Sequence, residues 1–132
     1  MNNSLKGVTE RFQQEEKFDK EALVDLINIY MSNGKFKKML GWIKDKTFEG
    51  EEFYGIMYPD EYEKGEEGYF GEGRVLVYVG NDDLENKDQV VSYNELYSYL
   101  RTAGDYYIEN IPEDKEEVEN LLTIIRVRYD VN

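Results

Sequence analysis

The sequence predicts an α+β domain with an N-terminal helical hairpin, a small mostly antiparallel β-sheet and two C-terminal helices packed on the sheet. Two patterns indicate this class. Apolar residues recur at helical spacing before residue 47 and again after residue 92, and at a spacing of two between them. A length of 132 residues suits one domain, so we expect a single domain over 1–132, with 1–18 as a peripheral lead-in.

The predicted hairpin follows the lead-in, in which Val8 and Phe12 are the residues that could dock on the core. Asp19 is placed to cap its first helix, and Asn33-Gly34 to end it, because these residues tolerate the left-handed backbone of a C-terminal cap. Trp42 is either a core residue or a partly exposed anchor, and we favour the core. Each helix has one apolar stripe: Ala22, Leu23, Leu26, Ile27 and Tyr30 in the first, and Phe36, Met39, Leu40 and Ile43 in the second.

Three strands are expected between the hairpin and the C-terminal helices. The first covers 53–58, and a short third strand covers 89–91. The second, over 75–79, is β-branched and aromatic, and its near-continuous apolarity predicts a central strand covered on both faces or nearly so. The four glycines between residues 62 and 73 indicate either a loop or a hairpin with bulges.

Two helices are predicted to complete the chain. Ser92 and Glu95 have the spacing of a capping box, in which each side chain satisfies the backbone N–H of the other residue, so a helix should start there. Pro112 should end this helix and occupy the first position of the next. The two apolar stripes are Leu96, Tyr99, Leu100, Ala103 and Tyr107, then Val118, Leu121, Leu122, Ile125 and Tyr129.

The composition excludes several kinds of chemistry. The chain has no cysteine and no histidine, so it offers no disulfide, no thiolate nucleophile and none of the commonest zinc ligands. No stretch approaches the roughly 18 apolar residues that cross a bilayer. The first six residues have no apolar core of a secretion signal, so we predict a cytoplasmic protein.

Three patterns in the sequence partly resemble sites of chemistry. Residues 68–73 are glycine-rich but lack the spacing of a phosphate-binding loop, and nearby glutamates would repel a phosphate. Residues 81–88 are rich in oxygen ligands but do not follow the order of a calcium-binding loop. Paired carboxylates could serve acid–base catalysis, yet among 29 acidic residues any pair is weak evidence. We therefore predict a protein that is not an enzyme, without catalytic residues, metal or cofactor.

The charge indicates the kind of partner. With 29 acidic against 16 basic residues, the formal net charge is −13. Such a field repels nucleic acids and anionic membranes and speeds encounter with a basic protein. The alternative is that the charge only keeps the protein soluble.

Acidic residues concentrate between Glu49 and Glu72, where Lys64 alone opposes them and tyrosines are interleaved. Carboxylates mixed with tyrosines suit a surface that pairs with lysine and arginine and supplies rigid contact area. The alternative is a solvated sheet edge that guards against strand addition. We predict that this segment and the turn at 82–83 bind the partner, through Glu49, Glu51, Glu52, Tyr58, Asp60, Glu61, Tyr62, Glu63, Glu66, Glu67, Tyr69, Glu72, Asp82 and Asp83.

Two C-terminal stretches, VVSYNELYSYL over 90–100 and YYIENIPEDKEEVENLL over 106–122, resemble the immunity proteins of contact-dependent growth inhibition (CDI) systems. The resemblance is greatest to their ribonuclease toxin immunity group, and it covers about residues 50–128, with a looser match before them. It implies a cytosolic, non-catalytic protein that binds the C-terminal domain of one cognate nuclease toxin. The toxin is then expected to be a ribonuclease, with the EndoU-like class as one candidate.

Charge and resemblance together give the hypothesis that the acidic segment covers the basic RNA-binding cleft of such a toxin. Two alternatives stay open. The protein could be an acidic nucleic-acid mimic or adaptor that binds another basic protein, or a small hydrolase that depends on carboxylates.

Overall fold

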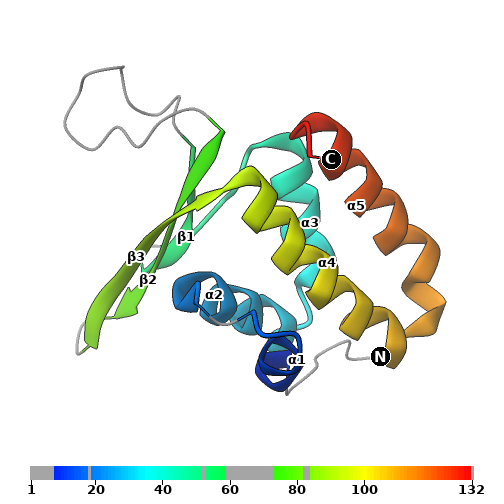
Figure 1. Cartoon of the computed structure of the whole chain (residues 1–132), viewed down its shortest axis with the longest axis horizontal. Coiled ribbons are helices and arrows are strands. Elements are labelled where there is room, and N and C mark those ends of the chain that lie inside the picture. The colour runs from blue at the N-terminus through cyan, green and yellow to red at the C-terminus, as the bar shows by residue number, and fades with distance from the viewer. Residues whose placement is uncertain (1–7, 18, 52, 59–72, 82–83, 132) are drawn as a thin grey trace.

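The computed structural model describes residues 8–17, 19–51, 53–58, 73–81 and 84–131. Within these ranges the chain forms five α-helices and one three-stranded antiparallel sheet, which confirms the α+β class. Figure 1 shows the sheet on one side of the molecule and the helices on the other. No described helix is long and apolar enough to cross a membrane.

The predicted helical hairpin is confirmed as α2 (Glu21–Ser32) and α3 (Phe36–Asp45). Gly34 between them has φ of 72°, a conformation that glycine adopts without the strain of a Cβ. The short α1 (Val8–Gln14) precedes the hairpin and packs on α2 and α4. Its Val8 and Phe12 are fully buried, so the predicted docking of these two side chains is confirmed.

The N-terminus of α2 corrects one prediction, because Asp19 does not cap this helix. The cap position is Lys20, which makes no side-chain capping bond. The amide oxygen of Gln89 instead accepts the N–H of Ala22 at 2.7 Å, and its amide nitrogen donates to the carbonyl of Asp19 at 3.2 Å. The carboxylate of Asp19 accepts a hydrogen bond from the Tyr99 hydroxyl. A strand residue far away in the sequence therefore closes the start of this helix.

The sheet consists of β1 (Tyr54–Met57), β2 (Arg74–Asn81) and β3 (Leu84–Ser92), in the order β1-β2-β3 with antiparallel pairing throughout. The prediction that the second strand is central is confirmed. The third strand is longer than the predicted 89–91. Its first half is polar and has weak strand propensity, but pairing with β2 extends it.

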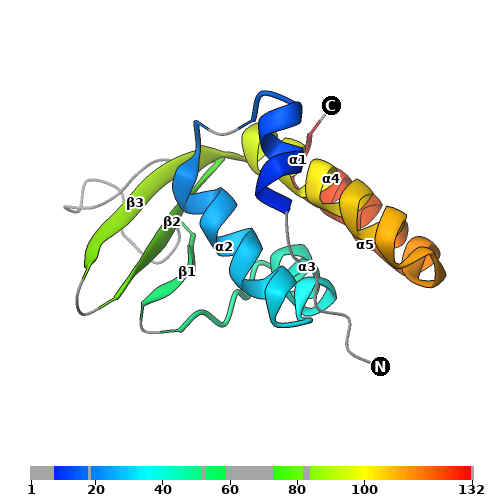
Figure 2. The same cartoon turned by 90° about the horizontal axis from the view of Figure 1, so that it is seen from below.

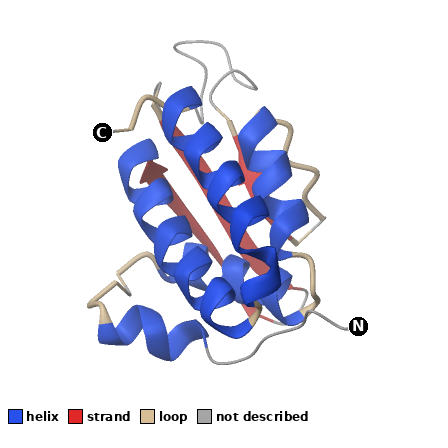
Figure 3. Ribbon diagram, turned by 90° about the vertical axis from the view of Figure 1, so that its right-hand side faces the viewer, coloured by secondary structure: helices blue, strands red, loops and turns tan. Residues whose placement is uncertain are grey.

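One face of the sheet is covered by helices, as Figures 2 and 3 show from two further directions. Helix α2 lies against β2 and β3, and α4 (Tyr93–Asn110) adjoins β3. The last helix, α5 (Lys115–Arg128), packs on α3 and α4 rather than on the sheet. No described helix lies on the other face of the sheet, where Leu76 and Tyr78 are half-buried, so the described helices do not cover β2 on both faces or nearly so, as had been expected.

The start of α4 confirms the predicted capping box. Glu95 N–H donates to the Ser92 hydroxyl at 3.1 Å, and Ser92 N–H donates to the Glu95 carboxylate at 3.0 Å. This cap fixes the point where β3 turns into α4. Pro112 opens the 3₁₀ turn Pro112–Asp114, which leads into α5.

Candidate functional site

The structure describes three of the fourteen residues that were predicted to bind a partner: Glu49, Glu51 and Tyr58. The other eleven lie outside the described residues: Glu52, Asp60, Glu61, Tyr62, Glu63, Glu66, Glu67, Tyr69, Glu72, Asp82 and Asp83.

Glu49 and Glu51 are exposed in the connection between α3 and β1. The backbone of Glu51 is held against the sheet, because its N–H donates to the Tyr54 carbonyl at 2.7 Å and its carbonyl accepts the Tyr78 hydroxyl at 3.0 Å. Neither carboxylate makes an ion pair with a described residue. Both carboxylates are thus available to a cationic partner, and that of Glu51 stands on a fixed backbone.

Tyr58 belongs to the core, which corrects its place in the predicted surface. Its side chain is 5 % exposed, and its hydroxyl lies 2.5 Å from that of Tyr129 on the last turn of the chain. Strand alternation explains the position, because Ile56, two residues earlier, is buried on the same side of the sheet. The spacing of two along 54–58 was the sequence signal for this burial.

The described residues that border the predicted surface lie at both ends of the sheet. Glu51 precedes β1 and lies at the end where β2 and β3 are joined, between Asn81 and Leu84. Tyr58 and Gly73, the described residues on either side of 59–72, both lie at the opposite end. Asn81 and Leu84, the described residues on either side of 82–83, thus lie at the same end of the sheet as Glu51, whereas Tyr58 and Gly73 do not.

The uncovered face of the sheet connects these two ends. Leu76 and Tyr78 of β2 point to this side, since Val75 and Val77 are buried against the helices. The antiparallel register sets Leu76 between Met57 and Val90, its partners on the two neighbouring strands. None of Met57, Leu76 and Val90 was among the predicted binding residues, although the alternation along β2 indicated an outward face.

Acidic residues in the helical part are mostly neutralised within the fold. Three cations each bridge two carboxylates, and the hydrogen bonds from arginine lower the pKa values of Glu109 and Glu119. The three bridges are Arg11 with Glu15 and Glu109, Lys37 with Asp114 and Glu117, and Arg101 with Asp105 and Glu119. The segment 49–72, by contrast, holds nine acidic residues against one lysine in the sequence, or eight of the thirteen net negative charges.

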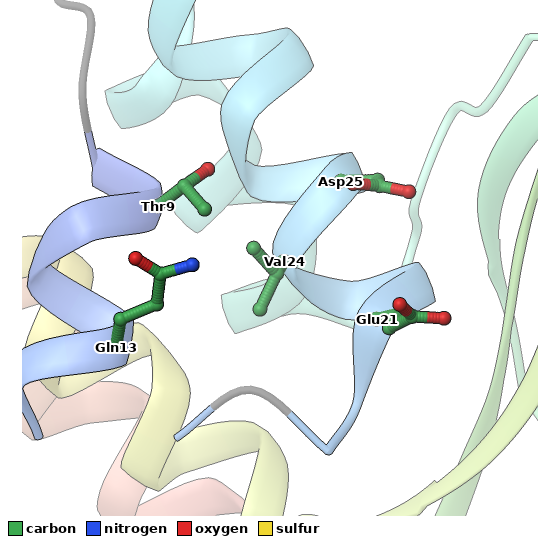
Figure 4. Close-up of a pocket in the computed structure, with 5 residues that line it drawn as sticks. All are labelled: Thr9, Gln13, Glu21, Val24 and Asp25. Atoms are coloured by element: carbon green, nitrogen blue, oxygen red, sulfur yellow. The ribbon is translucent and has the colours of Figure 1, made fainter. Parts of the chain in front are cut away.

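A groove of about 460 Å³ lies between α1 and α2. Figure 4 shows Thr9 and Gln13 facing Val24, whereas the carboxylates of Glu21 and Asp25 point away from α1. Asp25 is also paired with Lys87 of β3 at 2.8 Å.

A comparison with protein families matches residues 20–122 to a family described as CDI immunity protein. This match covers most of the chain, including α2, α3, the described strands, α4 and the first half of α5. No curated protein and no solved structure matches the chain.

Proposed function

Because this chain belongs to the CDI immunity protein family, whose members neutralise toxins, we propose that it inhibits a cognate ribonuclease toxin in the cytoplasm by covering its basic RNA-binding cleft. The protein acts by binding and carries out no catalysis. The EndoU-like class is the candidate for the toxin that the sequence resemblance favours.

The concentration of negative charge in one part of the chain is the observation that carries the ribonuclease assignment. A nuclease binds the phosphates of RNA through lysine and arginine, and an inhibitor can offer carboxylates to the same cations. Helical carboxylates of this protein are largely paired internally, whereas Glu49 and Glu51 and the sequence that follows them carry the surplus. A surplus of this kind also speeds the encounter with a basic toxin.

The test is co-expression of the protein with the toxin domain encoded beside it, together with binding measured on purified proteins. We expect growth to be rescued and ribonuclease activity to be blocked. A variant with Glu61, Glu63, Glu66 and Glu67 changed to lysine should bind the toxin at least about thirtyfold more weakly, if two or more of these residues form close charge pairs worth roughly 1–3 kcal/mol each.

The matched control changes four other exposed glutamates to lysine: Glu10, Glu16, Glu113 and Glu116. None of the four makes an ion pair among the described residues, and the net charge changes by the same amount in both variants. Thermal unfolding should show that both variants are folded. A control variant that loses as much affinity as the first would show that total charge, and not the acidic segment, governs recognition. Failure of the unmodified protein to rescue growth would contradict the proposed function itself.

A further inference from the structure

We propose that the uncovered face of the sheet forms the apolar centre of the toxin-binding surface, with the acidic residues at its margins. The inference rests on the proposed function and adds the part of the interface that excludes water. The outer sheet face is defined here by Phe53, Met57, Leu76, Tyr78 and Val90.

The composition of the outer sheet face is unusual for a surface open to water. An antiparallel sheet with one solvated face normally alternates apolar residues inward and polar residues outward. Here Val90 is 40 % exposed and Phe53 is 37 % exposed, and Met57, Leu76 and Tyr78 are half-buried without any described helix above them. A contiguous exposed apolar patch with polar margins is typical of an interaction site.

Pairing across the strands makes these residues one continuous patch. Leu76 lies directly between Met57 and Val90, and Tyr78 lies between Gly55 and Asp88. Phe53 extends the patch beyond β1, since its carbonyl accepts the N–H of Gly80 at 2.8 Å. Side chains directly opposite on neighbouring strands are about 4.5–5.5 Å apart at Cβ, which is close enough to form one surface.

Tyr78 gives the outer sheet face a rigid centre. A Cβ built on Gly55 would lie 2.6 Å from the Tyr78 hydroxyl oxygen, and one on Gly50 would lie 2.7 Å from it. The ring therefore extends across the start of β1, where only glycine leaves room for it, and its hydroxyl is tied to the Glu51 carbonyl. A tyrosine that is ordered before binding loses little conformational entropy in a complex, which favours it as an interface anchor.

The charges around the outer sheet face indicate a basic partner rather than a second copy of this chain. Glu49 and Glu51 lie at one end of the face, and Asp88 lies on it beside Tyr78. Among the described residues of the face, Arg74 at the opposite end is the single cation. Two copies meeting here would bring their carboxylates together, whereas a toxin with a cationic cleft would pair with them.

The test compares the same substitution on two faces. Val90→Arg places a cation in the outer sheet face, and Val127→Arg places one on α5, where Val127 is 66 % exposed. With the purified cognate toxin domain, made catalytically inactive, Val90→Arg should weaken binding by roughly tenfold or more, the loss typical of an interface anchor. Val127→Arg should leave the dissociation constant within about twofold of the unmodified protein.

Phe53→Ala and Ile124→Ala form a second pair, in case an arginine in β3 prevents folding. Both side chains are 37 % exposed, and only Phe53 lies on the outer sheet face. If Val90→Arg or Phe53→Ala binds the toxin as tightly as the unmodified protein does, the inference is overturned and the proposed function still stands. Sedimentation could also show that the unmodified protein is a dimer. If Val90→Arg dissociates this dimer without changing toxin affinity, the inference is overturned too, because a second copy would then cover the face. A wild-type protein that does not bind the toxin would contradict the proposed function instead.

Discussion

Buried tyrosines show how single hydroxyl groups are accommodated in this core. Tyr107 is 1 % exposed, and its hydroxyl donates to the carboxylate of Asp114 at 2.6 Å. Tyr30 is 4 % exposed, and its hydroxyl has no hydrogen-bond partner among the described residues. Rings of Trp42, Phe48 and Tyr54 surround it edge-on, and burial raises the pKa of Tyr30 to about 12. The same chemical change should therefore have opposite consequences at these two positions.

Tyr107→Phe should lower the free energy of unfolding by about 1.5–3 kcal/mol, because it removes a hydrogen bond to a charged group. Tyr30→Phe should leave it unchanged or raise it slightly, since the lost hydroxyl was buried without a partner. Urea denaturation of the two variants at neutral pH measures both effects. Equal losses would show that the Tyr30 hydroxyl has a partner in solution.

The Tyr107 effect should also depend on pH. The hydrogen bond from Tyr107, with help from Lys37, lowers the pKa of Asp114 below its ordinary value. A carboxylate with a lowered folded-state pKa stabilises the fold fully above its unfolded pKa of about 4, and this contribution is lost as the pH falls through the folded value. The stability difference between the wild type and Tyr107→Phe should thus be constant above about pH 5 and shrink below about pH 4. A difference that stays constant to about pH 3 would contradict the assigned role of Asp114.

At the scale of elements, the two capped helices show what the sequence could and could not predict. The cap of α4 is local, because Ser92 and Glu95 are three residues apart and satisfy each other. The cap of α2 comes from Gln89 on β3, a contact that exists only once the sheet is docked on the helix. Asp19 has a good capping side chain, but the Tyr99 hydroxyl holds it elsewhere. Tertiary contacts therefore override a local signal at one helix and leave it intact at the other.

Glycines in two helices allow a direct measurement of how tightly α4 and α5 pack. A Cβ on Gly104 of α4 would lie 2.7 Å from Cδ1 of the buried Leu122, whereas a Cβ on Gly41 of α3 would meet nothing within 4 Å. Gly41→Ala should raise the free energy of unfolding by about 0.5–1 kcal/mol through helix propensity. Gly104→Ala should give no such gain, because Leu122 must move within a close-packed core. Thermal unfolding compares the two variants. Equal gains in the free energy of unfolding would show that α4 and α5 pack less tightly around Leu122 than the structure shows.

At the scale of the whole molecule, the sequence shows how the charge is distributed along the chain but not where the charged residues lie in the fold. Net charge and the density of acids between 49 and 72 can be read without a structure. The opposite sheet ends at which Glu51 and Tyr58 lie cannot be read in this way, because they depend on the direction of β1. The strand β2 was expected to be covered on both faces or nearly so, since a sequence shows that Leu76 is apolar but not that the described helices all pack on the other face.

The last prediction concerns the charge of the whole molecule. Association with the toxin should slow by roughly ten- to a hundredfold between low and high salt, because ions screen the long-range field that guides encounter. Dissociation should change much less, since it depends on short-range contacts, including those of the outer sheet face. Stopped-flow or surface-based kinetics at several salt concentrations separates the two rates. The variant with lysine at Glu61, Glu63, Glu66 and Glu67 should show a flatter salt dependence than the matched control, although both have the same net charge. An association rate independent of salt would mean that the net charge of −13 has no part in recognition.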